Sequence, residues 1–353
     1  MANAELNSFD DFILTKTPSI SYLISKDGEI KRSFFGGYSL LEPKKIKTKS
    51  DTLYDLASLT KVFSTTLIAL KSYQNGTFDI NKTFSEKKNP FTPLDLLRHE
   101  AGFPSWYPLY KFSSKEEVYD FLLNKMERKK VAEEAIYSCP GYILLGFILE
   151  ETLNDSLNNL FFKLIANPSG IIKDAMFNPP SSLKEKIAGS ELKGDYEREM
   201  ALKEGCEKYP CASDDGLWGI VSDGNARFLG GVAGNAGLFA NLKGCYELSK
   251  LFLNGTSFLD KKVLKLCFER GRARSGEKRS AGFKMASEDS PVSRELKKGS
   301  VYHEGFTGTF VSISEDGEIL IMLTNRIHPI HPKVPFSNER VKFIQFCRKI
   351  LNG

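Results

Sequence analysis

The side chains best suited to chemistry are Ser58 and Lys61, which stand three residues apart at the start of a predicted helix. Positions i and i+3 share one face of a helix, so both side chains can point into the same space. A serine hydroxyl is a weak nucleophile until a base takes its proton. Lysine can be that base when burial and the positive end of a helix dipole lower its pKa. The pair therefore predicts a serine nucleophile activated by a lysine.

The spacing S-x-x-K alone is a weak signal, because it occurs at five serines of the chain. Only Ser58 stands between Asp55-Leu56-Ala57 and a long apolar helix, which would hold it rigidly in the interior. The other four copies, in polar and lysine-rich segments, begin at Ser85, Ser181, Ser190 and Ser275.

Two further segments carry residues that could join the same site. Tyr137–Cys139 precedes an apolar helix, and Tyr137 could relay a proton if a neighbouring cation stabilised its phenolate, although such a tyrosine is often plain packing. His303–Phe306 ends a predicted strand. A lone histidine is more often structural than catalytic, but Gly305 and Gly308 allow close backbone approach to a ligand.

Strand signals stand at both ends of the chain. Asp-Gly turns at 27–28 and 316–317 each separate two apolar runs, which indicates two hairpins because glycine accepts positive φ. With one further short strand, we expect strands over residues 20–24, 30–35, 301–304, 309–314 and 319–324.

Helix signals fill the middle of the chain and its end. A capping box is predicted at Ser113 and Glu116. The expected helices are Leu59–Tyr73, one opened by Thr92-Pro93, one from Ser113 to Met126, Gly141–Leu153 and an amphipathic Asn338–Leu351. The simplest architecture is α+β: one antiparallel sheet from both chain ends, the final helix packed on it, a mostly helical insertion, and a cleft between them.

The bulk composition is that of a globular protein. The chain has 353 residues, 41% of them hydrophobic and 26% charged, enough for a substantial core. Its net charge of +5 is spread out, so no nucleic-acid partner is expected. No apolar run approaches the ~20 residues of a membrane helix, and residues 1–18 lack signal-peptide features. We expect a cytoplasmic protein, or a periplasmic or extracellular one if an export signal has been removed.

Six cysteines occur without a C-x-x-C pair or zinc-ligand spacing. Free buried thiols in a reducing compartment are the expected state, although Cys206 and Cys211 could pair in an exported protein. No metal and no organic cofactor is expected.

The three polar segments, in this order, resemble those of the class C beta-lactamase-like serine hydrolases. That group includes class C beta-lactamases, low-molecular-weight penicillin-binding proteins, D-aminopeptidases and family VIII esterases. Further segments are similar to the family's nucleophile block, its "LLxHTSGLP" and "GGVAGHAGLFST" segments and the close of its last strand, at residues 54–62, 96–104, 230–239 and 323–329. The similarity runs from about residue 20 to 350.

The resemblance implies a five-stranded antiparallel sheet with flanking helices and a helical subdomain. We therefore expect a single domain over residues 19–352, with the sheet region at about 19–57 and 280–352. The helical region would span about 75–270, and residues 1–18 would be an N-terminal extension.

The resemblance also implies roles for these residues. Ser58 would form an acyl-enzyme, and Lys61 and Tyr137 would move its proton. His303 stands where many relatives have the lysine of a K-T-G triplet, and with Gly305 it would help to orient the substrate. The backbone N–H groups of Ser58 and Phe306 would form the oxyanion hole.

Three positions depart from the family pattern. Cys139 stands where relatives commonly have an asparagine that contacts the lysine and the substrate, and a thiol is a weaker hydrogen-bond partner. Glu304 replaces the usual threonine or serine and could disfavour substrates that bear a carboxylate. Asn235 replaces a common histidine. These departures favour an esterase or a specialised peptidase or amidase over an efficient beta-lactamase.

We therefore predict a serine hydrolase that acts through an acyl-enzyme on a small ester or on a peptidoglycan-derived peptide or amide, with weak beta-lactamase activity at most. The alternatives are a catalytically decayed penicillin-binding or peptidoglycan-sensing protein on the same fold, and a chance resemblance on another fold. The joint retention of the motif residues favours the enzyme: Ser58, Lys61, Tyr137, His303 and Gly305.

Overall fold

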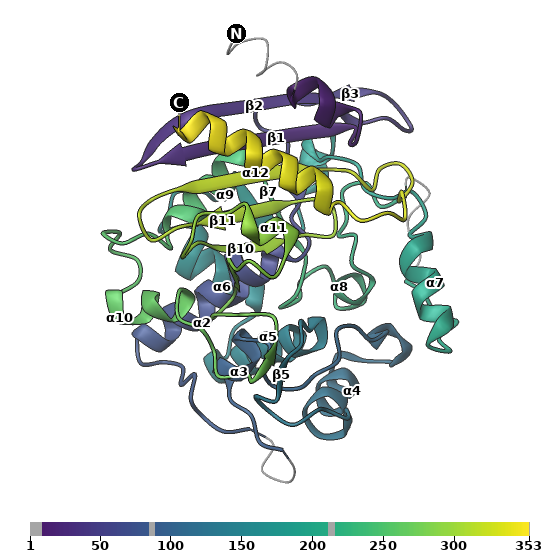
Figure 1. Ribbon diagram of the computed structural model, residues 1–353. Helices are drawn as coiled ribbons and strands as arrows, with labels where there is room; N and C mark the ends of the chain where they lie inside the picture. Colours follow the sequence, from purple (N-terminus) through teal and green to yellow (C-terminus); the bar gives the residue numbers. More distant parts are fainter. Residues whose placement is uncertain (1–8, 85–88, 211–215, 353) are drawn as a thin grey trace.

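Strands from the two ends of the chain form one antiparallel sheet in the computed structural model, which describes residues 9–84, 89–210 and 216–352 (Figure 1). The strand order is β3-β2-β1-β12-β11-β10-β9. The five long strands are β1 (Ser19–Lys26), β2 (Glu29–Leu40), β10 (Val301–Glu304), β11 (Phe310–Ile313) and β12 (Ile319–Thr324). The two-residue strands β3 (Ile46–Lys47) and β9 (Lys284–Met285) extend its edges, so the sheet has seven strands where five were expected.

The hairpin between β1 and β2 turns where the sequence predicted it. Asp27 has φ 54° and Gly28 has φ 80°, the left-handed pair that a two-residue hairpin turn requires. Strand β1 then pairs with β12, with Ile20 opposite Thr324, which joins the first and last strands of the chain.

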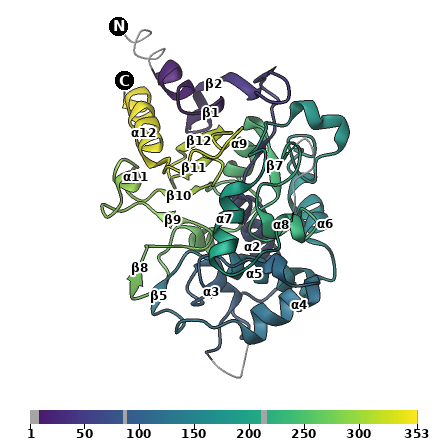
Figure 2. The same cartoon turned by 90° about the vertical axis from the view of Figure 1, so that its right-hand side faces the viewer.

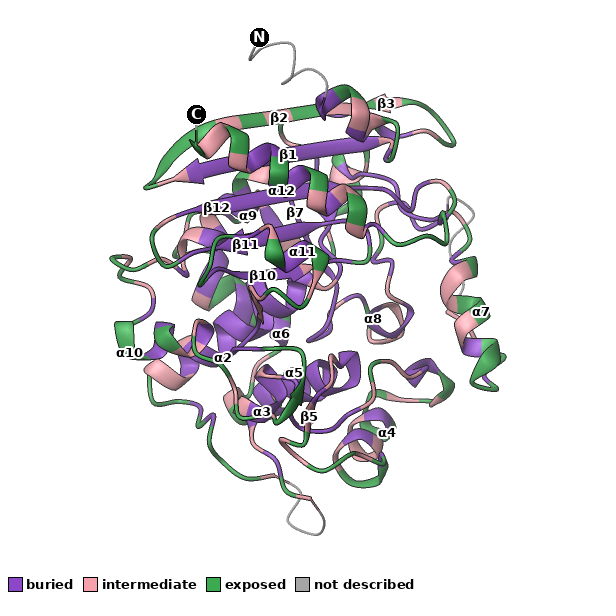
Figure 3. Ribbon diagram, in the orientation of Figure 1, coloured by how far each residue is buried: buried purple, intermediate pink, exposed green. Residues whose placement is uncertain are grey.

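Helices cover both faces of this sheet. Helix α12 (Ser337–Asn352) packs on one face and α9 (Leu242–Lys250) lies on the other (Figure 2). Residues 9–14, in the segment that we set apart as an extension, are helical, and the Phe9 ring stacks on Phe346 of α12 with 4.4 Å between ring centres. The inner strands are buried along their length, whereas β2 is largely exposed (Figure 3).

A helical region with short strands lies below the sheet in Figure 1. Its helical segments are η1 (Lys61–Thr66), α2 (Leu67–Gln74), α3 (Pro93–Leu97), η2 (Leu109–Lys111), α4 (Lys115–Asp120), η3 (Phe121–Lys125), α5 (Cys139–Leu153), α6 (Leu157–Phe161), η4 (Phe162–Ala166), η5 (Ser181–Lys186), α7 (Asp195–Lys203), α8 (Gly224–Phe228), α10 (Lys261–Leu264) and η6 (Lys265–Cys267). Helix α11 (Pro291–Arg294) instead lies beside the sheet and packs against α12. Strands β4 (Tyr54–Asp55), β7 (Leu238–Ala240) and β6 (Ala175–Phe177) form a small sheet, and β5 (Glu134–Ala135) pairs with β8 (Ser275–Gly276).

Two predicted helix starts need correction. The capping residue of α4 is Ser114 and not Ser113: its hydroxyl accepts from the Glu117 N–H at 3.2 Å, and Glu117 accepts from the Ser113 N–H. Two consecutive serines followed by two glutamates allow either register. Helix α5 begins at Cys139, two residues before the expected Gly141, because the Ser138 hydroxyl caps it.

Five of the cysteines lie within the described residues, where each is buried and free: Cys139, Cys206, Cys245, Cys267 and Cys347. Cys211, with which Cys206 could pair in an exported protein, lies outside the described residues. Within the described ranges no helix is both long and apolar enough to cross a membrane.

Candidate active site

Ser58 stands in a tight turn between β4 and the first helix, and this turn is braced from two sides. The residue before it, Ala57, has φ 47°, a left-handed conformation that costs an alanine energy. The buried Asp55 carboxylate supports the turn, because it accepts from the Ala57 N–H at 2.8 Å and from the Ser222 N–H at 2.7 Å. The Thr307 hydroxyl donates to the Asp55 carbonyl at 2.8 Å, which fixes the turn after β10 against the turn of Ser58.

The structure brings together the three residues predicted to carry the chemistry. Lys61 Nζ lies 3.1 Å from Ser58 Oγ, and the Tyr137 hydroxyl donates to the same oxygen at 2.6 Å. Lys61 and Tyr137 thus both donate to Ser58 Oγ.

Lys61 is fully buried, and all three protons of its ammonium group are used in hydrogen bonds. Nζ also donates to the Asn235 carbonyl at 3.0 Å and to Cys139 Sγ at 3.4 Å, which uses its three protons. Burial lowers the pKa of Lys61, but its interactions with the acidic groups of Cys139 and Tyr137 outweigh burial and hold the pKa above the ordinary value. The expectation of a lowered pKa is therefore wrong, because acidic groups from other segments surround the amine.

Tyr137 lies between two cations. Its ring centre is 5.0 Å from Lys61 Nζ and 5.1 Å from the guanidinium of Arg279. Burial raises the pKa of Tyr137 above its ordinary value, and the charge of Lys61 opposes this rise. In the resting site, we therefore expect an ammonium group at Lys61 and a neutral phenol at Tyr137.

His303 is buried at the end of β10 and is uncharged at neutral pH. Burial, and then the charges of Lys61 and Arg279, hold its pKa well below 6.5. Its Nδ1 lies 3.0 Å from the Glu304 carbonyl, so Nδ1 carries the proton and Nε2 is left as an acceptor. No described residue bonds to Nε2.

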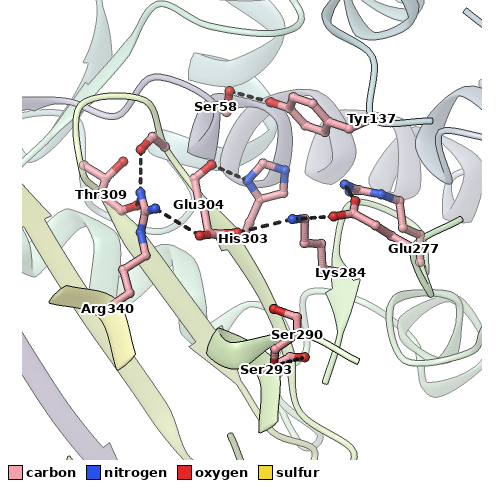
Figure 4. A network of polar contacts seen from close by, with 12 residues as sticks. Ser58, Tyr137, Glu277, Lys284, Ser290, Ser293, His303, Glu304, Thr309 and Arg340 are labelled. Carbon is pink, nitrogen blue, oxygen red and sulfur yellow. Dashed lines mark hydrogen bonds and ion pairs between the residues drawn. The ribbon is translucent and has the colours of Figure 1, made fainter. Parts of the chain in front are cut away.

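Glu304 is neutralised by two cations and points to a different side than the His303 ring (Figure 4). One carboxylate oxygen lies 3.0 Å from Arg340 and the other 3.3 Å from Lys284. Lys284 also pairs with Glu277 at 2.6 Å, and Glu277 pairs with Arg279. Glu304 does line the cleft, but its two cationic partners weaken the expectation that it would disfavour substrates that bear a carboxylate.

Gly305 allows β10 to approach the turn of Ser58. A Cβ atom there would lie 1.9 Å from Thr309 Oγ1 and 2.9 Å from the Leu56 carbonyl oxygen, so a side chain has no room. The next residue, Phe306, is 40% exposed. Neither the Ser58 N–H nor the Phe306 N–H donates to a backbone carbonyl of the described residues, so both remain available to a ligand.

Ser58 opens into a cleft with two lobes. The first lobe, of about 610 Å³, is rich in cationic side chains, and the second, of about 290 Å³, contains three carboxylates. Ser58, Tyr137, Tyr196 and Phe306 line both lobes. Helix α7, which carries Tyr196, lies on the outside of the molecule and faces the viewer in Figure 2.

The sequence analysis missed most of the charged residues of the cleft. Arg326 lay in a segment with a recognised resemblance but received no role. Arg340 had a usable signal, because it falls among the apolar positions of an amphipathic helix and is itself buried. Lys284, Arg279 and Glu277 lie in a stretch without clear periodicity and offered no signal. Within the described ranges, no group of three His, Cys, Asp or Glu side chains is arranged to hold a metal ion.

The fold is that of beta-lactamase-like serine hydrolases, and comparisons with known proteins agree. The family model described as Beta-lactamase matches residues 13–335. A curated protein of Salmonella heidelberg, named "Putative D-alanyl-D-alanine carboxypeptidase", is 30% identical over 360 residues, covering 90% of this chain and 81% of the relative. A Salmonella typhimurium protein of the same name matches equally well.

Solved structures share the fold at low identity. A beta-lactamase/D-alanine carboxypeptidase from Pseudomonas syringae has a TM-score of 0.75 at 14% identity, with 98% of each chain covered. The hydrolase EstCE1 has a TM-score of 0.70 at 16% identity, covering 99% of this chain and 98% of that one. The chain belongs to the beta-lactamase family and is a serine hydrolase.

Proposed function

We propose that this protein is a carboxypeptidase-type serine hydrolase, in which Ser58 takes the acyl part of a peptide or related ester and releases a leaving group that bears a carboxylate. The observation that carries the proposal is the convergence of Lys61 and Tyr137 on Ser58 Oγ, at 3.1 and 2.6 Å, where the two lobes of the cleft meet.

The proton path follows from these contacts. Before Ser58 attacks, one proton must leave the Lys61–Tyr137 pair, so that the amine or the phenolate can accept the serine proton. The remaining positive charges, on Arg279 and on Lys61 when it is protonated, stabilise a phenolate at Tyr137. The same pair can then deprotonate the water that hydrolyses the acyl-enzyme. The N–H groups of Ser58 and Phe306 are the candidate oxyanion donors.

The first lobe supports a carboxylate-bearing leaving group. Arg326 lines it without forming an ion pair to a described carboxylate; its guanidinium donates to the Val334 carbonyl at 2.9 Å, and its Nε has no described partner. Burial and the neighbouring charge of Arg340 lower the pKa of Arg326 to about 10, and the charge of Glu339, which forms no ion pair with it, opposes this fall only in part. Glu304 does not oppose an anion here, because two cations already neutralise it.

The names of the curated relatives indicate which carboxylate-bearing substrate should be tested first. Peptides that end in D-alanyl-D-alanine place a carboxylate one residue beyond the scissile amide, and the Salmonella relatives are named for that substrate. We therefore favour a peptide of this type over a simple ester, with simple esters as accessory substrates.

The proposal is tested by mass spectrometry of the intact protein after exposure to a fluorophosphonate and, separately, to penicillin. Release of D-alanine from peptides ending in D-alanyl-D-alanine, with free and acetylated amino termini, is measured in parallel. We expect an adduct on Ser58 and D-alanine release, both absent in Ser58→Ala. An adduct without peptide turnover would favour an esterase. Absence of both would favour the decayed, ligand-binding alternative.

A further inference from the structure

The second lobe of the cleft has a chemical character opposite to that of the first. Three carboxylates line it, from Glu191, Glu197 and Asp223, and none of its described lining residues is a lysine or arginine. It opens beside Ser58 on the side of Cys139, whereas Arg326 lines the other lobe. A substrate lying across Ser58 therefore meets negative charge at one end and positive charge at the other.

None of the three carboxylates forms a direct ion pair with a described lysine or arginine, although the charge of Arg227 acts on Glu191 and Glu197. Asp223 accepts from the Ala226 N–H at 2.8 Å and from the Asn235 amide at 3.0 Å. The nearby guanidinium of Arg227 is occupied elsewhere, because it donates to two backbone carbonyls and to the Tyr209 hydroxyl at 2.6 Å. Neutral groups thus make the direct hydrogen bonds to Asp223, and the charge of Arg227 acts on Glu191 and Glu197 without a direct contact.

Glu197 supplies a second observation. Its Oε2 accepts from the Gly224 N–H at 2.7 Å, whereas its Oε1 is shielded from solvent and has the Tyr110 hydroxyl nearby without a well-formed hydrogen bond between them. Burial, and then the charge of Asp223, raise the pKa of Glu197 to about 8. A buried acceptor without a well-formed hydrogen bond is costly, and a cationic donor would satisfy it and restore its ionised form.

The remaining walls suit an ammonium group on a short chain. Trp106 and Tyr209 offer aromatic faces, which attract cations, and Met200 offers an apolar contact. The volume of about 290 Å³ is enough for one amino-acid residue or a short amine-bearing chain. The lobe thus combines negative charge, aromatic rings and limited size.

We propose that the second lobe binds a primary ammonium group on the acyl part of the substrate, so that the protein selects zwitterionic peptides with an amine in this lobe and a carboxylate beside Arg326. This inference rests on the proposed function. It names the substrate class: short peptides whose acyl part carries a free amino group. The two charges fix which side of the scissile bond becomes the acyl-enzyme.

The test compares peptides that differ only in this amine. D-Alanyl-D-alanine peptides with acyl parts of one and two residues are assayed with free and acetylated amino termini. We expect kcat/KM to favour the free amine by at least about tenfold at one of the two lengths, the scale of a desolvated charge pair. The preference should collapse in Glu197→Gln and persist in Glu204→Gln, which makes the same substitution at an exposed site after the end of α7.

A second measurement uses ester hydrolysis as a reporter, so that the idea stays testable if Glu197→Gln folds poorly. Butylammonium should inhibit the wild-type protein competitively, whereas butanol at the same concentration should not. Equal or faster hydrolysis of both acetylated peptides, or equal inhibition by amine and alcohol, would overturn the ammonium site and leave the proposed function intact. Failure of the proposed function is recognised separately, by the absence of any Ser58 adduct and any turnover.

Discussion

The guanidinium of Arg279 lies 5.1 Å from the centre of the Tyr137 ring, and Arg279 is almost fully buried there. Many relatives have a lysine at the position of His303, but this histidine is held neutral here. We propose that Arg279 supplies the positive charge that His303 lacks and so favours the phenolate form of Tyr137. It does so as a positioning residue, without contact to the substrate.

Arg279→Gln should move the pH midpoint of acylation upward by about one unit, since one pKa unit corresponds to ~1.4 kcal/mol and the cation lies near the ring. Arg279→Lys should restore most of the wild-type profile. The measurement is the rate of fluorophosphonate labelling of Ser58 against pH.

Glu277→Gln is the matched control, because Glu277 pairs with Arg279 and its removal leaves the cation less neutralised. Its midpoint should move downward, opposite to that of Arg279→Gln. Shifts in the same direction for both variants, or a change in KM alone, would mean that Arg279 acts only on the fold.

Cys139 is a second position where a substitution is expected to change the acylation rate. Its Sγ accepts from Lys61 at 3.4 Å and lines the second lobe. In Cys139→Asn, the amide oxygen can take over this bond and its NH₂ can donate to the acyl part of a lactam. Wild type should turn over nitrocefin weakly, and the variant should be acylated up to about tenfold faster, the effect of one net hydrogen bond. Unchanged acylation by nitrocefin would remove Cys139 from substrate recognition.

The sequence predicted the features that follow from local residue patterns and from the order of motifs along the chain. The five long strands follow from alternating apolar runs and Asp-Gly turns, and Ser58 and Lys61 share a helical face. It could not predict the direction of the Lys61 pKa shift, because this is set by groups such as Cys139, 78 residues further along the chain. Charged side chains that come together only on folding, such as Arg279 and Arg326, are not marked by any periodic pattern in the sequence.

The buried His99 should make stability depend on pH. Its Nδ1 accepts from the Ser138 N–H at 3.0 Å, and burial, followed by the charges of Arg279 and Lys61, holds its pKa well below 6.5. The unfolded chain binds a proton near pH 6.5 and the folded chain does not, so stability falls as pH decreases below this value.

His99→Asn isolates this contribution, because asparagine tolerates the φ of 58° at this position and keeps an acceptor. The difference in unfolding free energy between wild type and variant should shrink by up to ~1.4 kcal/mol per pH unit below about pH 6.5. Urea denaturation at three pH values between 7.5 and 5 measures it. A difference that stays constant with pH would mean that His99 is charged in the folded protein.

The pH dependence of catalysis should follow the Lys61–Tyr137 pair and not His303. The pKa values of Lys61 and Tyr137 are raised, so the base form grows as pH increases, and kcat/KM for ester hydrolysis should rise from mildly acidic to mildly alkaline pH. His303 is already neutral across this range and should cause no fall. A wild-type optimum in acid that became alkaline in His303→Lys would make the imidazolium the working species.

Arg326 gives the sharpest test of how the leaving group is recognised. Its guanidinium lines the first lobe without a direct ion pair to a described carboxylate, so a substrate carboxylate would be its first ion-pair partner. Removing one partner of such a pair costs roughly 2–5 kcal/mol when the other charge stays buried. In Arg326→Gln, kcat/KM for peptides ending in D-alanyl-D-alanine should therefore fall by at least about thirtyfold, the lower end of that range.

The same variant provides its own internal control through the choice of substrate. Hydrolysis of an uncharged p-nitrophenyl ester should change less than about threefold, because that leaving group has no carboxylate for Arg326 to bind. Arg326→Lys should recover part of the peptide activity, since a lysine keeps the charge but loses the fork of donors. If peptide and ester activities fell together, Arg326 would support the fold of the cleft, and the carboxylate would have to be bound elsewhere.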